Sequence, residues 1–306
     1  MRGRSIYVSE ILAAILGFLF LPVVALGQPS ESGTWTARAA DQYEVIPNIT
    51  YLTANNWDAK LDLYLPTNPK AQNPTLIWIH GGGWTIHSKE MEMLYILPYL
   101  EMGWSVVNVE YRLARVSLAP AAVEDCRCAL RWVIANAQKY RFDTSKLVLS
   151  GISAGGHLAL TTGTLPRSAG LDSQCSGSEE LKVAAIINWF GPSDVADLID
   201  GPHAIDQAIS WLGSQPNRVE IAKRVSPITY VRQGLPPIIT IHGDQDAVVP
   251  HSQSVRFHQA LDKAGVPNQL VTIKGRGHGD FNREETLSAY AAIREFLIRN
   301  NVLRRN

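Results

Sequence analysis

The sequence predicts an α/β fold in which a mostly parallel sheet is covered by helices on both faces. Two observations predict it: short apolar runs suited to buried strands recur along the chain, and they alternate with longer segments that have apolar residues at helical spacing. Strands joined by crossover helices line up in parallel, with the helices packed against both faces. The strand-like runs are 61–65, 75–79, 105–109, 146–150, 183–189, 238–241 and 269–273. The helical patterns are 121–139, 154–163, 252–264 and 284–300.

Two stretches depart from this alternation. Residues 43–65 contain two strand-like runs joined by Ala54-Asn55-Asn56, which leaves too few residues for a crossover helix. We expect an antiparallel hairpin there, at the amino-terminal edge of the sheet. Residues 191–227 are interrupted by Gly, Pro and Asp and carry short helical pieces such as 204–212. We expect this segment to form a small lid, inserted between two core strands and lying over the carboxyl ends of the sheet.

The amino end has the composition of an export signal. Two arginines are followed by the uncharged apolar run 11–26, and small residues flank a cleavage point before Gln28. A membrane anchor is the alternative, but the run is shorter than the roughly 20 residues that span a bilayer and contains Gly and Pro. We expect a signal peptide over 1–27, a single domain over 28–306 without stable membrane insertion, and a secreted or periplasmic location. Residues 28–40 are aperiodic and predict a flexible leader.

Charge and cysteine content narrow the function classes. Lys plus Arg and Asp plus Glu both number 28, and no basic block occurs, so nothing predicts nucleic-acid binding. No Cys or His lies at the spacing of a zinc site, and we expect neither metal nor cofactor. Cys126 and Cys128 are two apart on an expected helix and diverge by about 200°, so they should not bridge each other. One of them could pair with Cys175, but the sequence favours buried free thiols.

Gly151-Ile152-Ser153-Ala154-Gly155 lies between an expected strand and an expected helix. In that context a G-x-S-x-G sequence predicts a sharp turn that presents Ser153 as a nucleophile in strained backbone geometry. Glycines are needed because side chains two positions either side of the serine would collide with the neighbouring strand and helix. The alternative is that Ser153 is an ordinary helix N-cap.

His80-Gly81-Gly82-Gly83-Trp84 directly follows the strand-like run 75–79. Successive glycines let backbone N–H groups point into a site without obstruction, as an oxyanion hole requires. A plain Gly-rich turn is the alternative, and the spacing does not continue into a phosphate-binding loop. With the serine turn, the motif predicts Gly82, Gly83 and Ala154 as oxyanion-hole donors. Trp84 is a candidate substrate-binding residue, with packing beneath the lid as an equal alternative.

The candidate acid and base follow the last two expected strands. His242-Gly243-Asp244-Gln245-Asp246 comes directly after the run 238–241, at the carboxyl end of a strand, where ligands bind in open α/β sheets. His278 lies in the Gly-rich segment 274–280, between the last strand and the last helix. Either Asp244 or Asp246 could in principle reach His278. His242, like His80, is expected to brace its own loop.

Together these motifs resemble the α/β-hydrolase esterases related to hormone-sensitive lipase, and more narrowly the bacterial feruloyl and acetyl esterase-like (BD-FAE) branch. The likeness covers about Tyr43 to the end of the chain. It implies the α/β-hydrolase fold, a carboxylesterase and, in the expected chain order, the triad Ser153, Asp246 and His278. Geometry favours Asp246 as well, because a loop needs a few residues after the strand to turn toward a neighbouring loop, whereas Asp244 suits a local turn.

The substrate is less well defined, because this fold hosts many chemistries. We expect a small-molecule or polysaccharide-linked ester with a short acyl group, since a small lid leaves little apolar wall. Acetyl or feruloyl esters of plant polysaccharide fit both export and the resemblance. An amidase or peptidase on the same fold would use the same triad. A catalytically silent ligand-binding homologue is a further alternative, although relatives of that kind have lost the triad histidine.

Overall fold

The computed structural model describes residues 31–68, 74–175, 177 and 179–305. The expected signal peptide, residues 1–27, lies outside the described residues. In the described part, eight strands form one sheet in the order β1-β2-β4-β3-β5-β6-β7-β8. The β1/β2 and β2/β4 pairs are antiparallel and the other neighbouring pairs are parallel, which confirms the predicted architecture. The strands are β1 Tyr43–Ala54, β2 Trp57–Pro66, β3 Thr75–Ile79, β4 Ser105–Val109, β5 Leu147–Ile152, β6 Ala185–Trp189, β7 Ile238–Gly243 and β8 Asn268–Ile273.

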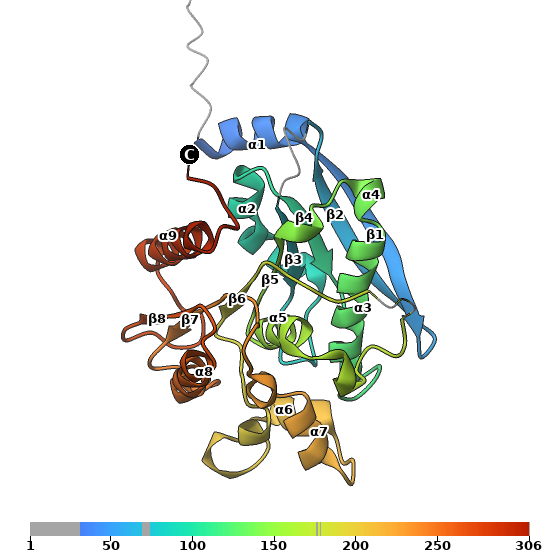
Figure 1. The fold of residues 1–306 in the computed structure, drawn as a ribbon, viewed down its shortest axis with the longest axis vertical. Helices are drawn as coiled ribbons and strands as arrows, with labels where there is room; N and C mark the ends of the chain where they lie inside the picture. The colour runs from blue at the N-terminus through green and yellow to red at the C-terminus, as the bar shows by residue number, and fades with distance from the viewer. Residues whose placement is uncertain (1–30, 69–73, 176, 178, 306) are drawn as a thin grey trace, which may run out of the picture.

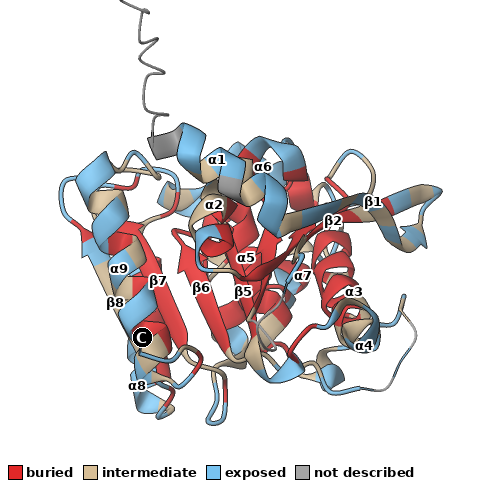
Figure 2. Ribbon diagram, turned by 90° about the horizontal axis from the view of Figure 1, so that it is seen from above, coloured by how far each residue is buried: buried red, intermediate tan, exposed pale blue. Residues whose placement is uncertain are grey.

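Helices cover both faces of the sheet (Figure 1). One face packs against α2 and α9 in one apolar cluster, and the other packs against α3, α5 and α8 in a second cluster. Figure 2 shows the central strands as buried and the outer sides of the helices as exposed. The α-helices are α1 Glu31–Gln42, α2 Met93–Glu101, α3 Ala121–Ala135, α4 Ala137–Tyr140, α5 Ala154–Thr164, α6 Asp206–Leu212, α7 Arg218–Arg224, α8 His251–Lys263 and α9 Arg283–Arg299.

The expected hairpin is confirmed at the β1 edge of the sheet. Asn55 and Asn56 form its two-residue turn, and both have a φ of 54°. A turn with positive φ at both central residues matches the twist of the paired strands, and Asn tolerates that conformation. Because β1 has only one neighbour, much of it is exposed (Figure 2).

Two helices differ from the sequence prediction. The expected flexible leader is wrong from residue 31 onward, where α1 forms and Trp35 packs against the cluster on the α2/α9 face. The sequence does not predict a helix at α2, whose residues MLYILPYLE are almost entirely apolar. Without polar residues at intervals there is no helical period to detect, and Pro98 inside the segment also argues against a helix.

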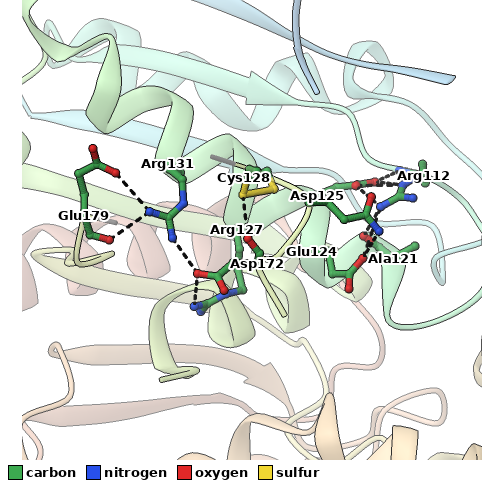
Figure 3. The surroundings of a disulfide bond; sticks show 11 residues. Arg112, Ala121, Glu124, Asp125, Arg127, Cys128, Arg131, Asp172 and Glu179 are labelled. Carbon is green, nitrogen blue, oxygen red and sulfur yellow. Dashed lines mark hydrogen bonds and ion pairs between the residues drawn. A yellow bond between two sulfur atoms is a disulfide. The ribbon is translucent and has the colours of Figure 1, made fainter. Parts of the chain in front are cut away.

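The expectation of free thiols is wrong for two of the three cysteines. Cys128 on α3 forms a disulfide with Cys175, and their Cα atoms are 5.5 Å apart. Cys126 is free and packs in the core, because two residues along a helix turn the side chain to the other side. Beside the disulfide, Asp172 accepts hydrogen bonds from Arg131 and Arg127 at 2.7 and 3.4 Å, as Figure 3 shows. The segment that carries Cys175 is therefore fixed to α3 by covalent and ionic links.

Residues 191–227, between β6 and β7, contain α6, α7 and short 3₁₀ turns. Figure 1 shows α6 and α7 together, below α5 in that view. The insertion packs inward through Trp211 of α6, which is fully buried. Across the residues that the structure describes, no helix is both long and apolar enough to cross a membrane.

Candidate active site

Ser153 stands alone between the end of β5 and the start of α5. Its φ of 51° and ψ of −120° are sparsely populated for a residue with a side chain. A β-carbon on Gly151 or Gly155 would lie 2.3 or 2.0 Å from the carbonyl oxygen of Ile79 on β3. The turn therefore requires glycine on both sides, as the sequence motif predicts. It holds the Ser153 hydroxyl at the carboxyl end of the sheet, away from the helix that follows.

The structure brings Ser153, His278 and Asp246 into one hydrogen-bonded line. His278 Nε2 lies 2.8 Å from Ser153 Oγ, and His278 Nδ1 lies 2.7 Å from Asp246 Oδ2. In the neutral imidazole, Nδ1–H donates to the carboxylate and Nε2 accepts from the hydroxyl. A hydroxyl, an imidazole and a carboxylate in such a line can act as nucleophile, base and orienting acid.

Asp246 is held by more donors than His278 alone. His242 Nε2 lies 3.1 Å from Asp246 Oδ2, and the backbone N–H groups of Val248 and Val249 donate to Oδ1 at 2.8 and 2.9 Å. Burial would by itself raise the pKa of Asp246, but the hydrogen bonds from His242, His278 and the backbone bring that pKa well below its ordinary value. The carboxyl group therefore stays charged although it is buried.

His242 has a larger part in this site than bracing its own loop. Its Nε2–H points at both Asp246 and the carbonyl oxygen of Val249, at 3.0 Å, while Nδ1 accepts from the Ser254 hydroxyl at 2.7 Å. The ring is fully buried and its orientation is fixed at both nitrogens. The spacing of His242 four residues before Asp246 is the only sequence signal for this contact.

Asp244 has a different set of partners. Its Oδ1 accepts the backbone N–H of Gly275 at 2.6 Å, so it ties the end of β7 to the loop that carries His278. Asp246, and not Asp244, contacts the imidazole.

The backbone N–H groups of Gly82, Gly83 and Ala154 have no acceptor among the described residues. All three residues border the same pocket as Ser153 and His278. Gly82 has a φ of +103°, and a β-carbon there would lie 2.2 Å from the carbonyl oxygen of Ile86. Only glycine fits at position 82. The N–H groups of this loop are open and available to an anionic oxygen.

Glu92 supports the same loop, and sequence reasoning missed it. Its Oε1 accepts the backbone N–H of Gly81 at 2.7 Å, and its other oxygen has no hydrogen-bond partner in the described part of the chain. Burial raises the pKa of Glu92 to about 7, and the Gly81 N–H together with the nearby Trp78 indole offsets only part of that effect. It lies at the end of a short 3₁₀ turn, Lys89–Glu92, where no motif marks it.

Trp84 borders the pocket, but its indole is only 1% exposed. The ring stacks on Trp211 of α6, with ring centres 4.5 Å apart, and its N–H donates to His157 Nδ1 at 3.1 Å. Of the two expectations for Trp84, the structure therefore favours packing beneath the insertion over contact with substrate. His157 in turn donates to the carbonyl oxygen of Val225, and burial lowers its pKa to about 4, which keeps it neutral.

The pocket at Ser153 has a volume of about 320 Å³. The pocket is lined by Pro192, Ile205 and Gln207 of the insertion. It is also lined by Val248 and Val249, which follow Asp246 in its loop. No group of His, Cys, Asp and Glu within the described ranges is arranged to hold a metal ion. The hollow thus combines a serine hydroxyl bonded to an imidazole and open N–H groups with mostly apolar walls.

Comparison with known proteins gives consistent relatives. Residues 61–261 match the family described as BD-FAE. Esterase LipC of Mycobacterium tuberculosis is 28% identical over 222 residues, which are 70% of this chain and 54% of that protein. The chain spans about half the length of the curated relatives it matches.

Two solved structures extend the likeness to nearly a whole domain. A truncated carbohydrate esterase from gut microbiota has a TM-score of 0.70 and 29% identity, over 85% of this chain and 98% of that one. The thermophilic esterase Est2 of Thermogutta terrifontis with butyrate bound has a TM-score of 0.71 and 28% identity, over 87% of this chain and 96% of that one.

Proposed function

Because this chain belongs to the BD-FAE family of α/β-hydrolases, we propose that it is a serine carboxylesterase for short-chain acyl esters. The observation that carries the proposal is the line from Ser153 through His278 to Asp246, next to three N–H groups without acceptors among the described residues. Serine, histidine and aspartate in this order of contact are the parts that acyl transfer requires.

The proposed reaction has two acyl-transfer steps. His278 takes the proton of the Ser153 hydroxyl while Oγ attacks the ester carbonyl, and Asp246 stabilises the imidazolium. The C–O bond to the alcohol then breaks, and His278 gives its proton to the leaving oxygen. Water enters, loses a proton to His278 and attacks the acyl-enzyme. The acid is released and Ser153 regains its proton.

The charge that develops on the carbonyl oxygen needs donors that are already in place. We assign this role to the N–H groups of Gly82, Gly83 and Ala154, each contributing about 3 kcal/mol to transition-state stabilisation. Glu92 holds the loop through Gly81, one residue before the first of these donors. We treat it as a positioning residue, because it borders the Ser153 pocket and its hydrogen bond is to the backbone of Gly81.

The proposal for a short acyl group rests on the pocket. A volume of about 320 Å³, closed on one side by the insertion, suits acetyl to butyryl groups. The butyrate in the Thermogutta terrifontis relative is consistent with this size. The insertion over residues 191–227 would then act as a lid. Acetyl or feruloyl esters of plant polysaccharide are the natural substrates that we propose to test first, given the gut carbohydrate esterase among the relatives.

We also propose that the protein works outside the cytoplasm. The export-like residues 1–27 support this, and so does the Cys128–Cys175 disulfide, since disulfides persist in oxidising compartments. Sequencing the amino end of the protein recovered from culture medium and periplasm tests both points. A new terminus near Gln28 is the expected result, and recovery of uncleaved protein from the cytoplasm alone would contradict it.

The function itself is tested by comparing the wild type with Ser153→Ala on p-nitrophenyl esters from acetyl to dodecanoyl, methyl ferulate and acetylated xylan. We expect the highest kcat/KM between acetyl and butyryl, and no enzymatic turnover by the variant. Faster hydrolysis of a matched anilide than of the ester would identify an amidase instead. If the folded wild type binds esters without turning them over, it is a ligand-binding homologue.

A further inference from the structure

A second hollow, which we call the α2/α9 groove, adjoins the pocket at Ser153. It lies between α2 and α9 on one face of the sheet and has a volume of about 810 Å³. Tyr95 of α2 and Tyr290 of α9 border it, together with Trp189 at the end of β6. Phe190, Gly279 and Tyr95 border both hollows, so the groove lies directly beside the pocket.

The position of His278 decides which half of an ester faces this groove. In the proposed reaction His278 gives its proton to the leaving oxygen, so that oxygen lies beside Nε2. The rings of Phe190 and His278 are in contact, with centres 4.8 Å apart, and Gly279 is the next residue in the chain. Two of the residues that border both hollows thus adjoin His278, and the groove lies on the side of the leaving group.

The walls of the groove are mainly apolar. Leu94 and Leu287 lie on its opposite helices and are 78% and 57% exposed, so both helices present apolar side chains along the groove. Ile86, at the rim of the Ser153 pocket, is also exposed. The other lining residues are mostly aromatic or aliphatic, and the polar ones are Glu101, Arg283 and Thr286. Such walls leave the hydroxyl groups of a sugar largely without partners, whereas a ring packs well on aromatic side chains.

We propose that the α2/α9 groove binds the alcohol half of the substrate, and that this alcohol is apolar and carries a ring. Such an alcohol differs from the sugar of the polysaccharide esters that the relatives suggest as first test substrates. The inference rests on the proposed esterase function and deepens it: the acyl group is short, and much of the binding comes from the leaving group. In the step concerned, the Ser153 Oγ–acyl bond forms, the acyl–O bond to the alcohol breaks, and the proton on His278 goes to the alcohol oxygen.

Acetate esters of ethanol, 1-octanol and 2-phenylethanol test this directly, because the acyl group is constant and the three alcohols are similarly poor leaving groups. We expect kcat/KM for 2-phenylethyl acetate to exceed that for ethyl acetate by about tenfold or more, since each buried methylene group gives a several-fold gain. Octyl acetate should lie below 2-phenylethyl acetate.

The matched variants are Leu94→Glu/Leu287→Glu, in the groove, and Val45→Glu/Val219→Glu, at exposed positions outside both hollows. The first should lower the ratio of kcat/KM for 2-phenylethyl over ethyl acetate by about tenfold, and the second should leave that ratio unchanged, with melting curves to verify folding.

Equal kcat/KM for the three acetates, or an equal fall of the ratio in both variants, would overturn the groove proposal while the esterase function stands. A fully folded wild type that hydrolyses neither these three acetates nor the p-nitrophenyl esters would remove the esterase function itself. A higher kcat/KM for octyl acetate would overturn the preference for a ring.

Discussion

Two buried carboxyl groups support the candidate site: Asp246 contacts His278, and Glu92 contacts the glycine loop 81–83. They differ in the hydrogen-bond donors that contact them. Asp246, behind His278, accepts from two imidazoles and two backbone N–H groups. Glu92, behind the glycine loop, accepts one N–H. Accordingly the pKa of Asp246 lies well below its ordinary value, whereas burial raises the pKa of Glu92 to about 7. Burial raises the pKa of both carboxyl groups, and only Asp246 has enough donors to reverse that effect and keep its charge.

The difference suits the chemistry expected of each half. A charged Asp246 orients His278 and stabilises its cation. A carboxylate beside an oxyanion hole would repel the developing negative charge, and Glu92 is largely protonated below neutral pH. Four substitutions test this contrast, and the one with the greatest effect on turnover comes first.

Asp246→Asn removes the charge from the well-supported carboxyl group. We expect kcat to fall by up to about 10⁴-fold with the fold retained, because the amide presents the wrong histidine tautomer. Steady-state kinetics and a melting curve measure both. Asp244→Asn is the matched control two residues away, and it should keep most of its activity. A dead but folded Asp244→Asn enzyme beside an active Asp246→Asn enzyme would reverse the two assignments.

Glu92→Gln removes a titrating group whose pKa is higher in the folded protein than in the unfolded chain. Between pH 4.5 and about 7 the unfolded chain releases this proton while the folded protein keeps it, so the wild type loses stability as pH rises. The amide of the variant cannot titrate. The unfolding free energy of the wild type relative to the variant should therefore fall by up to about 3 kcal/mol from pH 4.5 to pH 8. Urea unfolding at both pH values gives this difference, and a pH-independent difference would show that Glu92 is already charged in the folded state.

His242→Asn removes one donor from Asp246 and leaves His278 in place. Loss of a hydrogen bond to a buried carboxylate should lower kcat by about tenfold. KM should change little, because His242 does not border the pocket. A purely structural role for His242 would instead lower the melting temperature and leave kcat per folded enzyme unchanged.

Asp244→Asn weakens the tie between the end of β7 and the loop of His278. The amide oxygen can still accept from Gly275, so we expect only about 1 kcal/mol less stability in urea unfolding. Turnover should stay within about twofold of the wild type, since the bond that is weakened is to a loop and not to the imidazole. A larger loss of kcat than of stability would place Asp244 in the catalytic apparatus.

The sequence predicts best where one local pattern determines the structure. β3 and β4 begin and end at the predicted residues, because each is a run of five buried residues bounded by loop residues. The turn at Ser153 was predictable because any side chain at its two glycine positions would collide with β3. The contact of Asp246 with His278 was expected from the family resemblance and from the few residues that separate Asp246 from its strand, and the pairing of β7 with β8 places the two loops side by side.

What the sequence missed depends on contacts between distant segments. Glu92 meets Gly81 only because the turn before α2 folds back under the glycine loop. The Cys128–Cys175 pair joins residues 47 positions apart, and spacing alone does not give that pairing. The α2/α9 groove could not be foreseen, since α2 itself has no helical period in its sequence. The burial of Trp84 likewise depends on Trp211, more than a hundred residues further along the chain.

The proposed function depends above all on Ser153 being the single nucleophile, activated by His278. Intact-protein mass spectrometry after treatment with diethyl p-nitrophenyl phosphate is the decisive measurement, with Ser153→Ala as the control. We predict one diethyl phosphoryl group per chain, located on the peptide that contains Ser153, together with complete loss of esterase activity. An unmodified Ser153 peptide in protein that has lost its activity, or full activity in the Ser153→Ala variant, would contradict this assignment.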